Sequence, residues 1–247
     1  MSKEQFDLKK NEIESIDESQ VNYPDIPVNV VLQESENLMV WCQDDKEQLE
    51  KGGLDWNLVT DLTLRTGACR YIQSEWQKEY KGMLEVQKEW KVKSPEAYNL
   101  RNELLHHFYY AFKKMPDLYA QTQSIGKGSS HADMIQDLSD LAILGKANSS
   151  ALLAVGVDLE LLNRAETLSE EMSILLAKFN AKKLENSKLR LLRDKAYIHM
   201  KVAMDEIRRC GQYVFWRNKE RRKGYISQYL KKKNKRAKEK TEKTKKE

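Results

Sequence analysis

Apolar residues recur every three or four positions along most of the chain, a spacing that predicts amphipathic helices. The first apolar stripe begins at Val28 and stops at Gly52 and Gly53, which is typical of a helix that ends in glycine. A second stripe follows Asp55, whose carboxylate can cap a helix, and continues to Trp90. We therefore expect two helices between Val28 and Trp90.

The dipeptide Ser94 and Pro95 predicts a new helix start. A serine side chain can accept hydrogen bonds from the free amides of a first helical turn, and proline has no amide hydrogen to lose there. We expect the third helix to begin here and to reach Ile125, with a kink or break at Pro116. Residues 126–130 then predict a loop.

The remaining apolar positions predict three further helical segments. A short one covers about residues 132–144. Asp158 can cap the next, whose apolar face reaches Phe179. Residues 180–188 are polar and predict a bend or the start of a sixth helix, and apolar or small residues resume over 189–214.

The composition agrees with a helical fold. The chain has 247 residues, of which 33% are charged and 40% hydrophobic, and no proline follows Pro116. A long span without proline favours helices over a turn-rich β-sandwich. The sequence therefore predicts an all-α protein, an elongated antiparallel bundle of four to six helices with a long, projecting, basic C-terminal helix.

We expect three regions along this chain. Residues 1–25 are polar and show no helical stripe, so they predict a flexible N-terminal arm. Residues 26–216 carry the apolar stripes and form the helical bundle domain. Residues 217–247 form a basic helix extension and a lysine-rich tail.

No segment has the character of a membrane anchor or a secretory signal. The first ten residues are polar, which favours a cytoplasmic protein. The most apolar run, residues 141–157, is interrupted by polar residues and is too short to cross a bilayer. The basic tail lacks an apolar face that could insert. Membrane insertion is therefore not expected.

Charge is distributed unevenly along the chain. Residues 206–247 contain seventeen Lys and Arg against five Glu, a net charge of +12. Since the whole chain carries +5, residues 1–205 sum to −7. Residues 231–247 have no large apolar side chain and predict a frayed or disordered tail.

Aromatic residues stand among the first of these C-terminal cations, and together they form the candidate binding residues. Arg209, Tyr213, Arg217 and Arg221 recur every four positions, so on one helix they would form a single row. The full candidate set is Arg208, Arg209, Tyr213, Trp216, Arg217, Arg221, Arg222 and Tyr225.

Two interpretations of this set stay open. Its aromatic rings can stack on bases while its arginines pair with phosphates, or the surface can bind an acidic protein. Alternatively, the rings complete the bundle's packing and the cations neutralise its acidic helices. Residues 1–50 contain thirteen acids and four bases, which supports the second interpretation.

Metal and nucleophile chemistry has weaker support. Glu103 and His106 match the Glu-x-x-His spacing of di-iron helical bundles, but no second such pair occurs, and Glu103 can instead pair with His107. No cofactor is expected. The cysteines Cys42 and Cys69 fall on apolar stripes as small core residues, as does Cys210.

Three functions follow from these patterns. The first is a non-enzymatic interaction or scaffold protein that associates with itself or with a protein partner. The second is a nucleic-acid-associated protein that uses the basic, aromatic C-terminal helix. The third is a metal-binding oxidoreductase centred on Glu103 and His106. No hydrolase, phosphate-loop or zinc motif occurs in the chain, so an enzyme is not expected.

Overall fold

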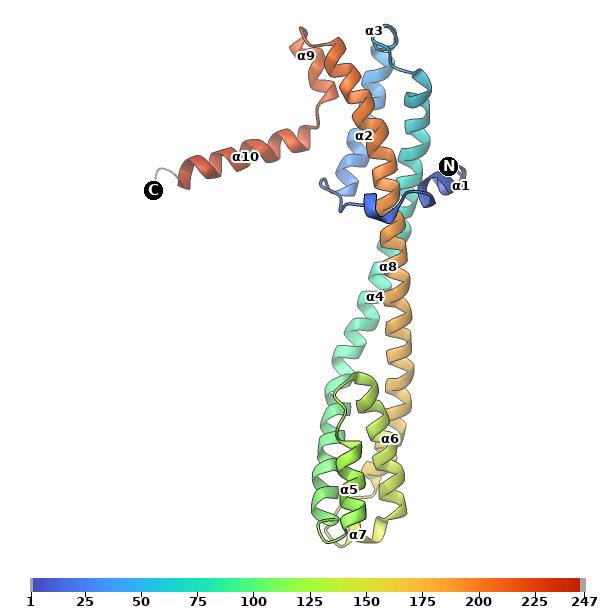
Figure 1. Cartoon of the computed structure of the whole chain (residues 1–247), viewed down its shortest axis with the longest axis vertical. Helices are drawn as coiled ribbons and strands as arrows, with labels where there is room; N and C mark the ends of the chain where they lie inside the picture. Colours follow the sequence, from blue (N-terminus) through green and yellow to red (C-terminus); the bar gives the residue numbers. More distant parts are fainter. Residues whose placement is uncertain (1, 245–247) are drawn as a thin grey trace. The chain divides into compact units, whose positions relative to one another are not determined.

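The computed structural model describes residues 2–244, with side-chain environments for residues 2–239, and its regular elements are all helices (Figure 1). No strand occurs among these described residues, so the all-α class is confirmed. None of the described helices is both long and apolar enough to span a membrane. The elongated antiparallel bundle of four to six helices and its projecting C-terminal helix stay predictions.

The chain divides into two compact units. Unit 1 comprises Met1–Lys78 and Asn186–Glu247, and unit 2 comprises Glu79–Glu185. The two longest helices, α4 (Trp56–Ala111) and α8 (Glu160–Val214), contribute to both units. The ranges 1–25, 26–216 and 217–247 remain a prediction about domains.

Unit 1 is built around one apolar core. Its fully buried side chains include Ile13, Val31, Leu62 and Met200, which come from four different helices. Besides parts of α4 and α8, the unit contains α1 (Ser2–Glu14), η1 (Glu18–Gln20), α2 (Val28–Asp44), α3 (Lys46–Lys51), α9 (Lys219–Arg222), η2 (Lys223–Tyr225) and α10 (Gln228–Thr244).

Unit 2 has a separate core, to which Leu104, Phe108, Leu138 and Ala165 contribute fully buried side chains. Besides parts of α4 and α8, it contains α5 (Pro116–Ile125), α6 (His131–Ala147) and α7 (Ser149–Leu153).

Several predicted helix ends are confirmed. Asp55 accepts a hydrogen bond from the Asn57 amide at 3.0 Å at the start of α4, and Asp158 accepts one from the Glu160 amide at 2.9 Å at the start of α8. Gly53 has a φ of 91°, the left-handed conformation that glycine adopts readily after a helix. The chain also breaks before Pro116, which occupies the first turn of α5.

One predicted boundary is wrong, because α4 continues through Pro95. α8 also continues through the polar residues 180–188, so a sixth helix, one of the two alternatives expected there, does not begin in that stretch. Proline in a helix interior removes one backbone hydrogen bond, but Pro95 is exposed and lies between the buried Trp90 and Ala97. Burial on both sides of Pro95 keeps the helix continuous, because most helical stability in proteins comes from tertiary packing.

The N-terminal arm is helical, which differs from the flexible segment expected there. Phe6 and Ile13 of α1 are buried in the core of unit 1, and Lys9 Nζ lies 2.5 Å from Asp61 Oδ1 of α4. Gln5 lies directly over Gly67, where a Cβ atom would come within 1.8 Å of its side chain. Two apolar residues seven positions apart make too narrow a stripe for sequence patterns to detect.

His199 of α8 lies beneath α1 in a charged cluster. Its Nε2 is 3.1 Å from Glu12 Oε2, its Nδ1 is buried without a hydrogen-bond partner, and its carbonyl accepts from Arg65 at 2.9 Å. Burial, and then the charge of Arg65, lower the pKa of His199, although the Glu12 carboxylate opposes them. Folding therefore favours the neutral imidazole.

The continuous α4 predicts that Pro95→Ala stabilises the protein. Alanine restores the missing amide donor at an exposed position, so the free energy of unfolding should rise by about 1–3 kcal/mol in urea titrations. Pro116→Ala is the matched control, because proline at the first helical turn costs nothing there. Equal effects of the two substitutions would contradict a continuous helix at Pro95.

The burial of His199 predicts a loss of stability on acidification. A pKa lowered in the folded state means that the unfolded chain binds the proton more readily, so stability falls as the pH drops below about 6.5. Between pH 7.5 and 5.5, His199→Gln should flatten this fall, whose slope is at most about 1.4 kcal/mol per pH unit. The exposed His106→Gln serves as the control and should keep the wild-type slope.

Candidate functional site

The candidate binding residues do not share one helix. α8 ends at Val214, and Asn218 then caps the short helix α9 by accepting a hydrogen bond from the Arg221 amide at 3.0 Å. Arg209 and Tyr213 therefore lie on α8, whereas Arg217 and Arg221 follow its end. The single row expected from the four-residue spacing is wrong, because the helix stops within it.

Tyr225 fixes the segment that follows α8. Its ring is fully buried and stacks on Phe215, with centroids 5.6 Å apart and an interplanar angle of 16°. It lies so close to Gly211 that a Cβ atom there would be 2.1 Å from the ring. Its hydroxyl donates to Asp45 Oδ2 at 2.7 Å. The chain after α8 is thereby held against both α8 and the end of α2.

Asp45 stands at the break between α2 and α3 and receives a second donor. Arg221 Nε lies 2.8 Å from Asp45 Oδ1, and the Arg221 guanidinium lies over the Trp41 ring at 4.4 Å from its centroid. The hydrogen bond to Asp45 raises the pKa of Arg221. Since Asp45 is only 4% exposed, this charge requires such partners to remain buried.

Glu34, eleven residues before Asp45 on α2, plays the same role for α10. It accepts hydrogen bonds from Arg208 Nη2 at 2.8 Å, from the Ser227 hydroxyl at 3.0 Å and from the Tyr229 amide at 2.9 Å. Eleven residues are about three helical turns, so Glu34 and Asp45, which directly follows the last residue of α2, lie on the same side of that helix.

Three of the eight candidate residues therefore point inward: Arg208 bonds to Glu34 of α2, and Arg221 and Tyr225 bond to Asp45 at its end. The packing and neutralisation interpretation fits these three. Sequence reasoning missed their partners Glu34 and Asp45, for which the only signal was the acidic excess of residues 1–50.

The other five candidates are exposed. Tyr213 is 71% exposed and Trp216 is 61% exposed. The guanidinium of Arg217 lies over the Trp216 ring at 4.4 Å from its centroid, and Arg209 Nη1 is 3.5 Å from Glu206. Arg222 is exposed next to the inward-facing Arg221. We refer to these five exposed cations and aromatic rings together as the aromatic-basic surface.

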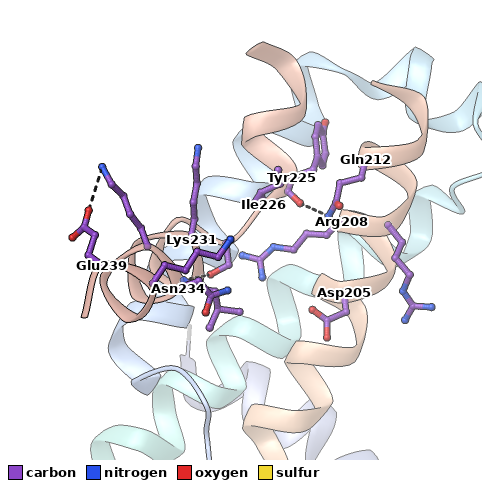
Figure 2. Close-up of a pocket in the computed structure, with 13 residues that line it drawn as sticks. Asp205, Arg208, Gln212, Tyr225, Ile226, Lys231, Asn234 and Glu239 are labelled. Carbon is purple, nitrogen blue, oxygen red and sulfur yellow. Dashed lines mark hydrogen bonds and ion pairs between the residues drawn. The ribbon is translucent and has the colours of Figure 1, made fainter. Parts of the chain in front are cut away.

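A groove of about 960 Å³ lies between the end of α8 and α10 (Figure 2). The apolar residues that line it are Ile226 and Leu230, together with part of Tyr225. Figure 2 shows Arg208 and Gln212 on one side and Lys231 and Asn234 on the other. Gln212 Nε2 donates to the Tyr225 carbonyl at 2.8 Å. This hydrogen bond joins the α8 side of the groove to η2.

α10 has two differently placed sets of cations. Lys231, Lys235 and Lys238 line the groove, whereas Lys232, Lys233 and Arg236 lie around Tyr229 on another face of the helix. The expected frayed or disordered tail is therefore helical up to Thr244, and residues 245–247 of that tail lie outside the described residues.

The weak metal candidates are not brought into a site. Glu103 and His106 are both exposed on α4, and Glu103 Oε1 instead lies 3.9 Å from His107 Nε2. Among the described residues, no three His, Cys, Asp or Glu side chains gather as metal ligands. Glu103 and His106 therefore do not fit a di-iron site.

The cysteines lie in or beside the core of unit 1, as expected. Cys42 and Cys69 are fully buried, and Cys210 is half-buried with its Sγ 3.7 Å from the Leu49 carbonyl. Burial raises the pKa of the Cys42 thiol to about 12, which keeps it protonated at neutral pH.

The pairing at Asp45 predicts a sharp difference between neighbouring arginines. Arg221→Ala leaves a buried carboxylate without its cation and should lower the free energy of unfolding by about 2–4 kcal/mol. Arg222→Ala removes the same charge from an exposed position and should cost less than about 0.5 kcal/mol. Urea titrations of both variants measure the difference, and equal losses would contradict a structural role for Arg221.

Comparisons with known proteins add no further assignment to this geometry. The chain matches no family model, no curated protein and no solved structure. The functional argument therefore depends on the described residues themselves.

Proposed function

We propose that this chain is a non-enzymatic helical interaction protein that binds an acidic protein partner at the C-terminal part of unit 1. The observation that carries this proposal is the division of the C-terminal cations. Arg208 and Arg221 are used inside the fold, while the aromatic-basic surface and the α10 lysines from Lys231 to Lys238 remain exposed.

The charge of α10 supports an acidic partner. The helix contains seven Lys and one Arg against two Glu, and its side chains over residues 231–239 are all exposed. Within that stretch, Lys235 and Glu239 form an ion pair at 3.9 Å, which leaves a large excess of positive charge. Such an excess attracts and orients an oppositely charged partner before contact.

The exposed aromatic rings support a specific contact. Tryptophan, tyrosine and arginine are enriched at the centres of protein interfaces, where they contribute most of the binding energy. Trp216 and Tyr213 are among the most exposed large side chains of unit 1, and Arg217 is already stacked on Trp216. This arrangement costs little conformational entropy on binding because the stacked pair is ordered beforehand.

Nucleic-acid association is the second candidate. The specific observation that favours it is the same stacked pair, since bases stack on tryptophan and arginine planes without regard to sequence. The predominance of lysine in α10 favours diffuse attraction over bidentate recognition of phosphates, so we place the protein partner first.

We test the proposal by chemical crosslinking and affinity capture with the full chain at about 0.15 M salt. The wild-type protein should capture an acidic protein, and the double substitution Tyr213→Ala and Trp216→Ala should reduce its recovery by about tenfold or more. The matched control is Tyr23→Ala with Tyr110→Ala. These exposed rings also carry a cation, Arg190 at 4.6 Å and Lys113 at 3.6 Å, but lie elsewhere.

Two parallel measurements separate the alternatives. Nuclease treatment that abolishes capture would favour nucleic acid, and concentration-dependent sedimentation of the purified chain would favour self-association. A strictly monomeric chain that captures no protein would contradict the interaction proposal.

A further inference from the structure

We infer that the groove between α8 and α10 is a docking site for an acidic amphipathic helix of the partner protein. This inference rests on the proposed function, because it names the kind of segment that the C-terminal part of unit 1 recognises. The shape of the groove and the positive charge of the residues along its rim identify the occupant.

The shape of the groove suits a helix. Its two walls are themselves helical, and Ile226 and Leu230 place apolar surface between them (Figure 2). Recognition of a helix in a groove uses one apolar stripe, with anchors spaced three, four and seven positions apart. An amphipathic helix can place such a stripe on Ile226 and Leu230 while its polar face remains in water.

The charges along the rim select an acidic helix. Lys231, Lys235 and Lys238 line the α10 side at spacings of four and three residues, so they follow one face for two turns. The acids that also line the groove are already paired, since Asp205 lies 3.0 Å from Lys201 and Glu239 lies 3.9 Å from Lys235. Because Lys235 is paired with Glu239, the positive charge that this rim offers to acidic residues beside an apolar stripe comes chiefly from Lys231 and Lys238.

Arg208 adds a fixed cation to the α8 side. It is 8% exposed, and its Nη2 donates to Glu34 at 2.8 Å, the same carboxylate that receives the Tyr229 amide at the start of α10. Its Nε has no hydrogen-bond partner among the described residues, an arrangement that is costly for a buried donor. A carboxylate of the bound helix that reaches this wall would supply the missing acceptor after a small movement of the side chain.

The test uses a synthetic peptide of about 18 residues, designed as a helix with a leucine stripe flanked by glutamates and labelled for fluorescence anisotropy. The full chain should bind this probe. It should bind a scrambled peptide of the same composition with an affinity lower by about tenfold or more. Equal binding of the two peptides would overturn the inference, as would failure of the probe to bind.

Two charge-reversal pairs on α10 locate the contact. Lys231→Glu with Lys238→Glu changes the groove rim, and Lys232→Glu with Arg236→Glu makes the same change of net charge on another face of the same exposed helix. The first pair should weaken probe binding by about tenfold or more, and the second by less than about threefold. Circular dichroism spectra of both variants should show the wild-type helix content.

The possible outcomes distinguish the inference from the proposed function. Equal losses from the two pairs would show attraction to the whole charge of α10 and would overturn the groove, while capture that depends on Tyr213 and Trp216 would still support the proposed function. If a single-stranded oligonucleotide displaced the probe and lost the same affinity in both charge-reversal variants, that result would also overturn the inference of a helix-docking groove. Dimerisation that is lost only in the first pair would assign the groove to a second copy and overturn a partner helix.

Discussion

The C-terminal part of unit 1 depends on two carboxylates on one side of α2, that of Glu34 within the helix and that of Asp45 directly after its end. Their side chains are only 11% and 6% exposed, and carboxylates so far removed from water are tolerated only when donors surround them. Asp45 receives Arg221 and Tyr225, while Glu34 receives Arg208 and the first turn of α10. These donors come from four consecutive elements of the chain, α8, α9, η2 and α10. The pairing of these two acids thus determines where the chain turns after α8, and with it which of the C-terminal cations remain exposed.

Local sequence patterns predicted local structure well and long-range pairing poorly. The caps at Asp55 and Asp158 and the left-handed Gly53 follow from residues within one turn, so the sequence alone identifies them. The expected break at Ser94 and Pro95 does not occur, because burial of neighbouring residues in unit 2 outweighs the single lost hydrogen bond. The sequence did not predict helix α1, because only two of its residues are buried in the core. Ion pairs such as Lys9 with Asp61 help to hold this helix in place.

The candidate site shows the same division. Sequence reasoning singled out residues 208–225 because their cations and aromatic rings are conspicuous in the sequence. It could not assign Arg221 to Asp45, because these residues are 176 positions apart and no pattern within either segment connects them. The groove lining was also hidden, since Lys231 and Lys232 look alike in the sequence and differ only in the face of α10 on which they lie.

The division of the chain into units has a consequence for the order of folding during synthesis. Unit 2 is one continuous stretch, Glu79–Glu185. Its core residues are therefore synthesised in one run and can pack as soon as that stretch is complete. Unit 1 needs segments from both sides of that stretch, and the bond between Arg221 and Asp45 closes a loop of 176 residues. Glu34 and Asp45 therefore stay without these partners until residues 208–229 have been made. Folding of unit 2 in the meantime shortens the effective distance that this last closure has to bridge.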